Sequence, residues 1–293
     1  MSTYRGRFAP SPTGPLHFGS LFAAVISYLE AHSHNGEWLV RIEDIDSLRE
    51  QKSASNNIIE TLNSHCLFSD ASIIYQSTRS NLYQQTIEHL QSDKLAYVCP
   101  CSRNYLRQYN GVHKSACINQ ILKTAEFAIK FRTDQTHEEQ NIFMWNDDFQ
   151  GNQIRNLTED FVLKRKEGFY AYQLAVVCDD IAQDISHVVR GYDLLESTPM
   201  QLALYYALNE VPPTFAHFPV IAFKNGQKLS KQNKAPAIDN KLALENLLAV
   251  FSLLGLKLKH KPDNCKHALN EALENWDSKF LYRKSELIRD SHL

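Results

Sequence analysis

The feature that most constrains the fold is the segment R-F-A-P-S-P-T-G-P-L-H-F-G-S, which runs from Arg7 to Ser20. Residues 4–10 predict a short strand, and the prolines and glycine that follow break it and stiffen the turn. A helix rich in small and apolar residues begins near Leu21. This order places a helix N-terminus at the end of a strand, where free N–H groups and the helix dipole favour phosphate.

The next segments continue the alternation of strand and helix. The run W-L-V-R-I-E-D at 38–44 predicts a second strand, and Ile58, Ile59 and Leu62 have helical spacing. Strand, helix, strand and helix in this order are typical of an α/β fold with a parallel sheet.

Residues near 95–150 interrupt this alternation with clustered cysteines and a polar stretch, which predicts an insertion. The pattern resumes at Tyr170, a helix is expected over Leu242–Leu254, and the last forty residues look helical and basic. The predicted parts are the first half of the α/β domain at 1–95, an insertion at 96–165, the second half at 166–238 and a helical C-terminal segment at 239–293.

The composition indicates the cellular compartment in which the chain functions. Of its 293 residues 43% are hydrophobic, and the sequence has neither an apolar run of 18 residues nor an apolar signal segment. We therefore expect a cytoplasmic protein that does not enter a membrane.

The net charge of −2 argues against general nucleic-acid binding but allows a local basic face. Three clusters of basic residues could bind RNA, and the alternative for each is a solvent-exposed charged face that binds nothing. They are Lys224, Lys228, Lys231 and Lys234; Lys257, Lys259, His260, Lys261 and Lys266; and Lys279, Arg283 and Lys284.

A second short motif, K-L-S-K at Lys228 to Lys231, lies beside Gly226. Two lysines around a small hydroxyl residue suit a mobile polyphosphate, because ammonium groups on flexible stems can follow it. Taken alone, this motif is an exposed lysine loop. In the first segment, His17 can donate to a phosphate and Gly19 leaves room for an adenine or a ribose.

The six cysteines are too scattered for a disulfide framework, but three of them cluster. Cys99, Cys101, His113 and Cys117 have the spacing C-x-C-x₁₁-H-x₃-C, and three thiolates with an imidazole suit tetrahedral zinc. The alternative is a set of buried cysteines in an ordinary insertion.

The motifs together resemble those of class I glutamyl- and glutaminyl-tRNA synthetases. A-P-S-P-T-G-x-L-H-x-G is similar to their version of the HIGH motif, and K-L-S-K is similar to the KMSKS loop. Phe18, Ser20 and Gln232 depart from the usual residues, whereas His17 and Gly19 are in place. The block R-I-E-D-I-D at 41–46 and the block from Tyr172 to Gly191 resemble further parts of the same family, and the likeness covers about residues 4–240.

The resemblance implies a Rossmann-type α/β catalytic domain, with a zinc-binding insertion, that activates glutamate with ATP and magnesium. The implied catalytic residues are His17 and Lys231, and the implied ATP-binding residues are His17, Gly19, Lys228 and Lys231. The implied glutamate-binding residues are Arg7, Ala9, Ser11, Glu43, Tyr172 and Arg190. Arg7 and Arg190 would bind the two carboxylates and Glu43 the amine, the alternative being a surface ion pair between Arg7 and Glu43.

The resemblance also implies one structural zinc per chain, bound by Cys99, Cys101, Cys117 and either His113 or, less favoured, Tyr109. This zinc would stabilise the part of the insertion that contacts the nucleic acid.

R-G-Y-D-L-L-E-S-T-P at 190–199 and the short remainder of about sixty residues after K-L-S-K resemble the truncated branch of the family, the glutamyl-Q tRNA(Asp) synthetases. That branch implies an enzyme that activates glutamate without tRNA and transfers it to queuosine at the wobble position of tRNA(Asp), and we expect a monomer. A shortened glutamyl-tRNA synthetase that charges the 3′ end of tRNA(Glu), a non-catalytic RNA-binding paralogue and a small-molecule nucleotidyltransferase remain open at this point.

Overall fold

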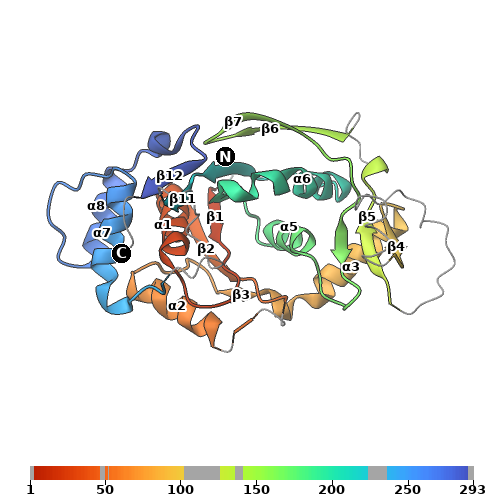
Figure 1. Cartoon of the computed structure of the whole chain (residues 1–293), viewed down its shortest axis with the longest axis horizontal. Helices are drawn as coiled ribbons and strands as arrows, with labels where there is room; N and C mark the ends of the chain where they lie inside the picture. Colours follow the sequence, from red (N-terminus) through yellow and green to blue (C-terminus); the bar gives the residue numbers. More distant parts are fainter. Residues whose placement is uncertain are drawn as a thin grey trace.

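The computed structural model describes residues 3–46, 50–51, 53–101, 126–135, 141–223 and 236–289. The molecule is elongated, with a central sheet and its helices between a mainly helical unit at one end and a small sheet at the other (Figure 1). Helices α7 and α8 lie at the first end, and strands β4 and β5 lie at the second. Among the described residues, no helix is long and apolar enough to cross a membrane.

The central sheet begins with the three strands β1 (Arg5–Phe8), β2 (Glu37–Ile42) and β3 (Ile74–Tyr75), which are parallel neighbours in that order. The helix α1 (Phe18–Ser33) connects the first two strands and buries one face of apolar residues in the core. The strand, loop and helix predicted from the first segment are confirmed.

The second half of the sheet contains β9 (His187–Gly191) and β10 (Thr214–Phe218), which pair in parallel. The backbone nitrogen of Ser186 donates to the oxygen of Arg5 at 3.0 Å and so places β9 beside β1. The resulting order β3-β2-β1-β9-β10 is that of a Rossmann-type sheet, and it confirms the predicted α/β fold. In such a sheet, ligands bind at the carboxyl ends of the strands where the order reverses, here between β1 and β9.

Two further groups of strands extend the structure. A hairpin of β6 (Ile142–Asp147) and β7 (Gly151–Asn156) joins the central sheet, because β6 pairs with β10. A separate antiparallel sheet contains β4 (Ala96–Cys99), β5 (Ala128–Phe131) and β8 (Val162–Lys164). This small sheet lies within the sequence range where an insertion was predicted.

Helices cover the sheet, and the sheet separates two hydrophobic clusters, one around α1, α7 and α8 and the other around α3, α5 and α6. The remaining α-helices are α2 (Ala54–Ser64), α3 (Ser80–Ser92), α5 (Tyr172–Ala182), α6 (Thr198–Ala207), α7 (Ala243–Leu253) and α8 (Cys265–Glu274). Short 3₁₀ helices are η1 (Gln76–Thr78), η2 (Thr133–Gln135), η4 (Tyr192–Ser197), η6 (Asn240–Leu242) and η7 (Ser278–Leu281).

The prediction of a wholly helical C-terminal segment is wrong in one respect. After α7, α8 and η7, the chain forms the strand β12 (Glu286–Arg289), which pairs in parallel with β11 (Val220–Phe223). Pro219 separates β11 from β10, so the backbone of β11 needs another partner, and β12 supplies it.

Candidate active site

The loop after β1 is fixed against the chain that follows β2. The backbone nitrogen of Glu43 donates to the oxygen of Pro10 at 3.0 Å, and that of Gln51 donates to the oxygen of Pro12 at 3.1 Å. Gly14 has a φ of +147°, a backbone conformation that favours glycine, which explains why this residue type occurs in the turn. These contacts hold Glu43 beside the loop.

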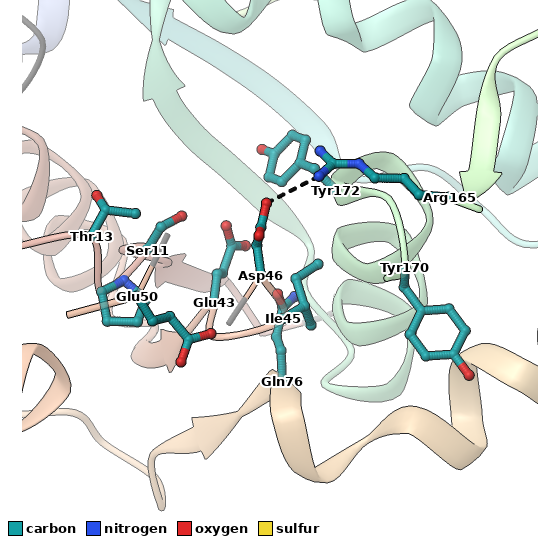
Figure 2. Close-up of a pocket in the computed structure, with 11 residues that line it drawn as sticks. Ser11, Thr13, Glu43, Ile45, Asp46, Glu50, Gln76, Arg165, Tyr170 and Tyr172 are labelled. Atoms are coloured by element: carbon teal, nitrogen blue, oxygen red, sulfur yellow. Dashed lines mark hydrogen bonds and ion pairs between the residues drawn. The ribbon is translucent and has the colours of Figure 1, made fainter. Parts of the chain in front are cut away.

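Two cavities meet at this loop. The first, which we call the inner pocket, has a volume of about 120 Å³ (Figure 2). Its polar lining residues are Ser11, Thr13, Glu43, Asp46, Glu50, Gln76, Arg165, Tyr170 and Tyr172. The second, which we call the groove, has a volume of about 590 Å³ and is lined mainly by loop and apolar residues, among them Phe8, His17, Gly19, Gly191, Phe218 and Val220. Ser11 and Thr13 line both cavities, so a ligand group in one lies next to a ligand group in the other.

The groove lies at the start of α1. His17 is the N-cap residue of this helix, and its Nδ1 accepts from the backbone nitrogen of Ser20 at 3.3 Å. His17 also forms a β-bridge with Ala237, while Ile221 of β11 lines the groove. Both flanks of the K-L-S-K segment therefore lie at the groove. Lys228 and Lys231 themselves fall outside the residues that the structure describes.

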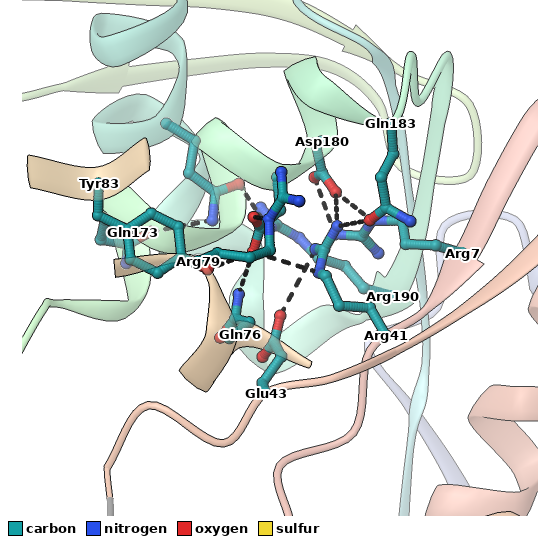
Figure 3. A network of polar contacts seen from close by, with 12 residues as sticks. Arg7, Arg41, Glu43, Gln76, Arg79, Tyr83, Gln173, Asp180, Gln183 and Arg190 are labelled. Carbon is teal, nitrogen blue, oxygen red and sulfur yellow. Dashed lines mark hydrogen bonds and ion pairs between the residues drawn. The ribbon is translucent and has the colours of Figure 1, made fainter. Parts of the chain in front are cut away.

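Behind the inner pocket, two consecutive carboxylates near the end of α5 organise several cationic and polar side chains (Figure 3). Asp180 accepts from Arg7 through Nε at 3.1 Å and Nη2 at 3.3 Å, and from Nη1 of Arg41 at 2.7 Å. Asp179 accepts from Arg79, Gln76 and Tyr83 at 2.5, 2.7 and 2.8 Å. Although burial raises the pKa of Asp180, Arg7 and Arg41 hold this pKa below its usual range.

Glu43 is buried among these groups. Its Oε1 lies 3.6 Å from Nη2 of Arg41, too far for a hydrogen bond. Burial raises the pKa of Glu43 to about 7, against the lowering effect of Arg41 and Arg7. The alternative of a surface ion pair between Arg7 and Glu43 is wrong, because both side chains are buried and the hydrogen bonds of Arg7 go to Asp180.

Arg190, on β9, is held by a second set of buried groups. Its Nε donates to Nε2 of His217 at 2.8 Å, and its terminal nitrogens donate to Gln201 at 2.7 Å and Thr198 at 2.9 Å. His217 in turn bonds to Asp147 through Nδ1, and burial lowers the pKa of His217 to about 4. The imidazole is therefore neutral, with its proton on Nδ1 and its Nε2 free to accept from Arg190.

Tyr172 interacts both with the charged groups around Asp180 and with Arg190. Burial raises the pKa of its hydroxyl, and the charges of Glu43, Arg190 and Arg7 all act on it. Glu43 and Tyr172 thus line the inner pocket, and Arg7 and Arg190 lie close enough to Tyr172 for their charges to act on its hydroxyl. Ser11 lies where the pocket and the groove meet, and Ala9 directly follows β1.

The sequence analysis missed the groups that hold these side chains in place. They are Arg41, Gln76, Asp147, Asp179, Asp180, Gln201 and His217. One signal was visible, since two adjacent aspartates in the otherwise apolar stretch L-A-V-V-C-D-D-I-A need buried partners. Asp147 and His217 gave no such signal, because they are far apart in sequence and meet only when β6 pairs with β10.

The predicted zinc ligands are described only in part. Cys99 is buried at the end of β4, and Cys101 packs against it. Burial raises the pKa of the Cys99 thiol, and the neighbouring Cys101 also affects it. His113, Cys117 and Tyr109 lie outside the described residues. Within the described ranges, no three His, Cys, Asp or Glu side chains gather as a metal site.

Comparison with known proteins adds independent evidence. Residues 3–259 match the family of tRNA synthetases class I (E and Q), catalytic domain. The chain is 41% identical to a glutamyl-Q tRNA(Asp) synthetase of Colwellia psychrerythraea, over 98% of this chain and 95% of that protein. It is 42% identical to the protein of the same name from Idiomarina loihiensis, over 94% of this chain and 98% of that protein.

Among solved structures, a glutamate tRNA ligase from Elizabethkingia meningosepticum in complex with its amino acid has a TM-score of 0.78 to this chain at 24% identity. The match covers 98% of this chain and 67% of that protein. A glutamate-tRNA synthetase from Elizabethkingia anophelis has a TM-score of 0.80 at 23% identity, with 99% and 68% covered. At these identities the likeness concerns the fold.

Proposed function

The chain belongs to the class I tRNA synthetase family specific for glutamate and glutamine, in the branch of the glutamyl-Q tRNA(Asp) synthetases, and from this premise we propose its reaction. It activates glutamate with ATP and transfers the glutamyl group to queuosine in the anticodon of tRNA(Asp). The observation that carries this function is the identity of 41–42% to glutamyl-Q tRNA(Asp) synthetases over nearly the whole chain.

The charges around the inner pocket suit glutamate. Arg7 uses two N–H groups on Asp180, so within the described part of the chain its remaining N–H groups are available to a carboxylate. Arg190 interacts with Tyr172, which lines the pocket, and Glu43 is the acceptor for the ammonium. A site built to pair a charged group rejects an analogue that leaves it unpaired by a factor of about 10⁴, so glutamine is excluded.

Activation takes place where the pocket and the groove meet. A carboxylate oxygen of glutamate attacks the α-phosphorus of ATP, an acyl-phosphate bond forms, and pyrophosphate leaves with its electron pair. The shared wall at Ser11 and Thr13 puts the amino acid in one cavity next to the phosphates in the other, which supplies the proximity that such a reaction needs.

The nucleotide-binding roles follow from position and chemistry. His17, at the N-terminus of α1, donates to a phosphate, and Gly19 leaves space for the nucleoside. Lys228 and Lys231 neutralise the charge that develops on pyrophosphate, and magnesium accompanies ATP.

In the second half-reaction, a hydroxyl of the cyclopentene diol of queuosine attacks the acyl carbonyl. An ester bond to the tRNA forms, and AMP leaves. The acceptor is proposed from the relatives, because the described residues contain no feature that identifies queuosine by itself.

We also propose one structural zinc ion in the insertion. The two described thiols fit this proposal, because Cys99 and Cys101 lie together at the end of β4. Cys117 and His113 would complete a tetrahedral set, with Tyr109 as the alternative to the histidine. The bound ion would fix this subdomain. Metal analysis of the Cys117→Ser variant tests the assignment, and full zinc content in that variant would contradict it.

The decisive experiment for the function is to locate the transferred glutamate. Labelled glutamate and ATP are incubated with the protein and total tRNA from cells that contain or lack queuosine. The proposal predicts label on an anticodon-loop fragment of tRNA(Asp) only when queuosine is present. Label on the 3′-terminal adenosine would instead support a shortened glutamyl-tRNA synthetase, and absence of glutamate-dependent pyrophosphate exchange would support a non-catalytic paralogue.

A further inference from the structure

Gln76 is a buried residue of the inner pocket to which the proposed mechanism gives no role. It is the first residue of η1, directly after β3, and its side chain is fully buried. Its Nε2 donates to Oδ2 of Asp179 at 2.7 Å, whereas its Oε1 has no hydrogen-bond partner among the residues that the structure describes. A buried carbonyl oxygen without a donor is unfavourable by about 1–3 kcal/mol, so an unpaired one in a binding pocket indicates a missing ligand group.

The orientation of this amide is determined by its surroundings. Asp179 also accepts from Arg79 and Tyr83, and as a carboxylate it can only accept. A flipped amide would place the oxygen of Gln76 against a carboxylate oxygen. The nitrogen must therefore face Asp179, and the oxygen remains as the acceptor.

The fold places Gln76 next to Glu43. Ile42 of β2 is paired with Tyr75 of β3. Glu43 follows Ile42 and Gln76 follows Tyr75, so the two residues lie at the same end of neighbouring strands. The adjacent residues reinforce this, because the backbone nitrogen and hydroxyl of Ser77 donate to Asp44 at 2.8 and 2.7 Å. Both residues line the inner pocket (Figure 2), and Figure 3 shows them next to each other.

We propose that the carbonyl oxygen of Gln76 is a second acceptor for the ammonium group of the amino-acid substrate, beside Glu43. An ammonium has three donors, and one carboxylate cannot satisfy all of them in a buried pocket. This inference rests on the proposed function, since it takes glutamate as the ligand. It also divides the pocket into an acceptor side at Glu43 and Gln76 and an arginine side at Arg7 and Arg190.

The test compares glutamate with glutarate, which is glutamate without its amino group. Dissociation constants are measured for the wild-type protein and for Gln76→Met, which keeps the length of the side chain but has no amide. We expect Gln76→Met to weaken glutamate binding about tenfold, because hydrogen bonds to charged groups contribute about 1.5 kcal/mol or more. Glutarate binding should change by less than about twofold, because that ligand has no group for Gln76.

A matched control separates direct contact from an effect through Asp179. Tyr83→Phe removes another donor to the same carboxylate oxygen, and Tyr83 does not line the inner pocket. We expect this variant to bind glutamate with nearly the wild-type constant. Should Tyr83→Phe reproduce the loss, or should Gln76→Met weaken both ligands equally, the role is structural and the inference fails. An unchanged glutamate constant in Gln76→Met overturns it as well.

If the Gln76→Met variant does not fold, the same two dissociation constants are measured for Gln76→Asn. Its shorter amide can reach Asp179 or the ligand but not both. The same selective loss for glutamate is expected, and equal loss for both ligands contradicts the proposal. Failure of the proposed function has a different signature, since the wild-type protein itself would then show no glutamate-dependent exchange of pyrophosphate into ATP.

Discussion

The inner pocket and the groove are adjacent cavities that are built in opposite ways. Around the pocket, buried charges hold one another: Asp180 binds Arg7 and Arg41, and Asp179 binds Arg79. The groove is formed largely by the loop after β1, the start of α1 and apolar residues of the neighbouring strands. Selection of a small charged amino acid needs fixed charges, whereas a polyphosphate that changes shape during reaction needs space and movable cations.

The two cavities also differ in how their residues are distributed along the chain. The groove takes much of its lining from one continuous segment, residues 8–23. The pocket takes its lining from the loop after β1, the segments that follow β2 and β3, the turn after β8 and the start of α5. The pocket therefore depends on several segments that are distant in sequence, and we expect its supporting charges to affect folding more than any side chain of the groove does.

The largest expected effect concerns stability. Asp180→Asn removes the charge that is shared by two buried guanidinium groups, and breaking such a pair is unfavourable by about 3–5 kcal/mol. Urea denaturation measures this loss as a lower free energy of unfolding. The control is Glu196→Gln at the exposed pair with Arg155, which should cost about 1 kcal/mol or less. Equal small losses in both variants would remove the claimed difference between the cavities.

The groove should show the reverse pattern, with a large effect on rate and a small one on stability. His17→Ala removes the proposed phosphate donor and should lower kcat for pyrophosphate exchange by about 10²–10³-fold. Its free energy of unfolding should fall by only about 1 kcal/mol, the usual effect of losing an N-cap. Ser33→Ala, at the exposed other end of the same helix, leaves the groove unchanged and should stay within about threefold of the wild-type rate. A His17→Ala variant that unfolds as readily as Asp180→Asn would contradict this pattern.

On the arginine side of the pocket, Arg190→Ala should reduce adenylate formation at least about tenfold, the effect of losing roughly 1.4 kcal/mol. The loss should appear at limiting glutamate, with little change in the KM for ATP, because Arg190 is bound to β10 and α6 residues around the pocket. Arg155→Ala, at an exposed ion pair, is the control and should be close to wild type. Wild-type activity in Arg190→Ala would refute its assignment.

A pH dependence is expected in the protein without any substitution. The pKa of Glu43 is raised to about 7 in the free protein, so this carboxyl becomes protonated below that pH. An ammonium ligand requires the ionised form, and glutamate affinity should therefore weaken by up to about tenfold per pH unit below 7 and level off above it. Calorimetric titration without ATP, between about pH 5.5 and 8, measures this profile. Glu43→Gln should bind weakly at every pH, and a wild-type profile as flat as that of the variant would count against the role of Glu43.

The same contrast explains how much the sequence could predict. The groove could be predicted, because the strand, the rigid loop and the helix N-terminus lie in one continuous segment around His17. The proposed glutamate-binding side chains, Arg7, Glu43 and Arg190, could be named because their motifs resemble those of the family. The groups that orient them could not, since the bonds between Arg7 and Asp180 or between Arg190 and His217 join residues that meet only in the folded sheet. The strand β12 was missed for the same reason, because its partner β11 is distant in sequence.

The central claim is that Arg7, Glu43 and Arg190 converge on one glutamate beside bound ATP. A crystal structure with glutamate and a non-hydrolysable ATP analogue tests it most directly. The account predicts the amino acid in the inner pocket, its carboxylates at the two arginines, its ammonium at Glu43, and the phosphates in the groove next to Ser11. Glutamate bound elsewhere, or bound with its ammonium facing the arginines, would contradict the account.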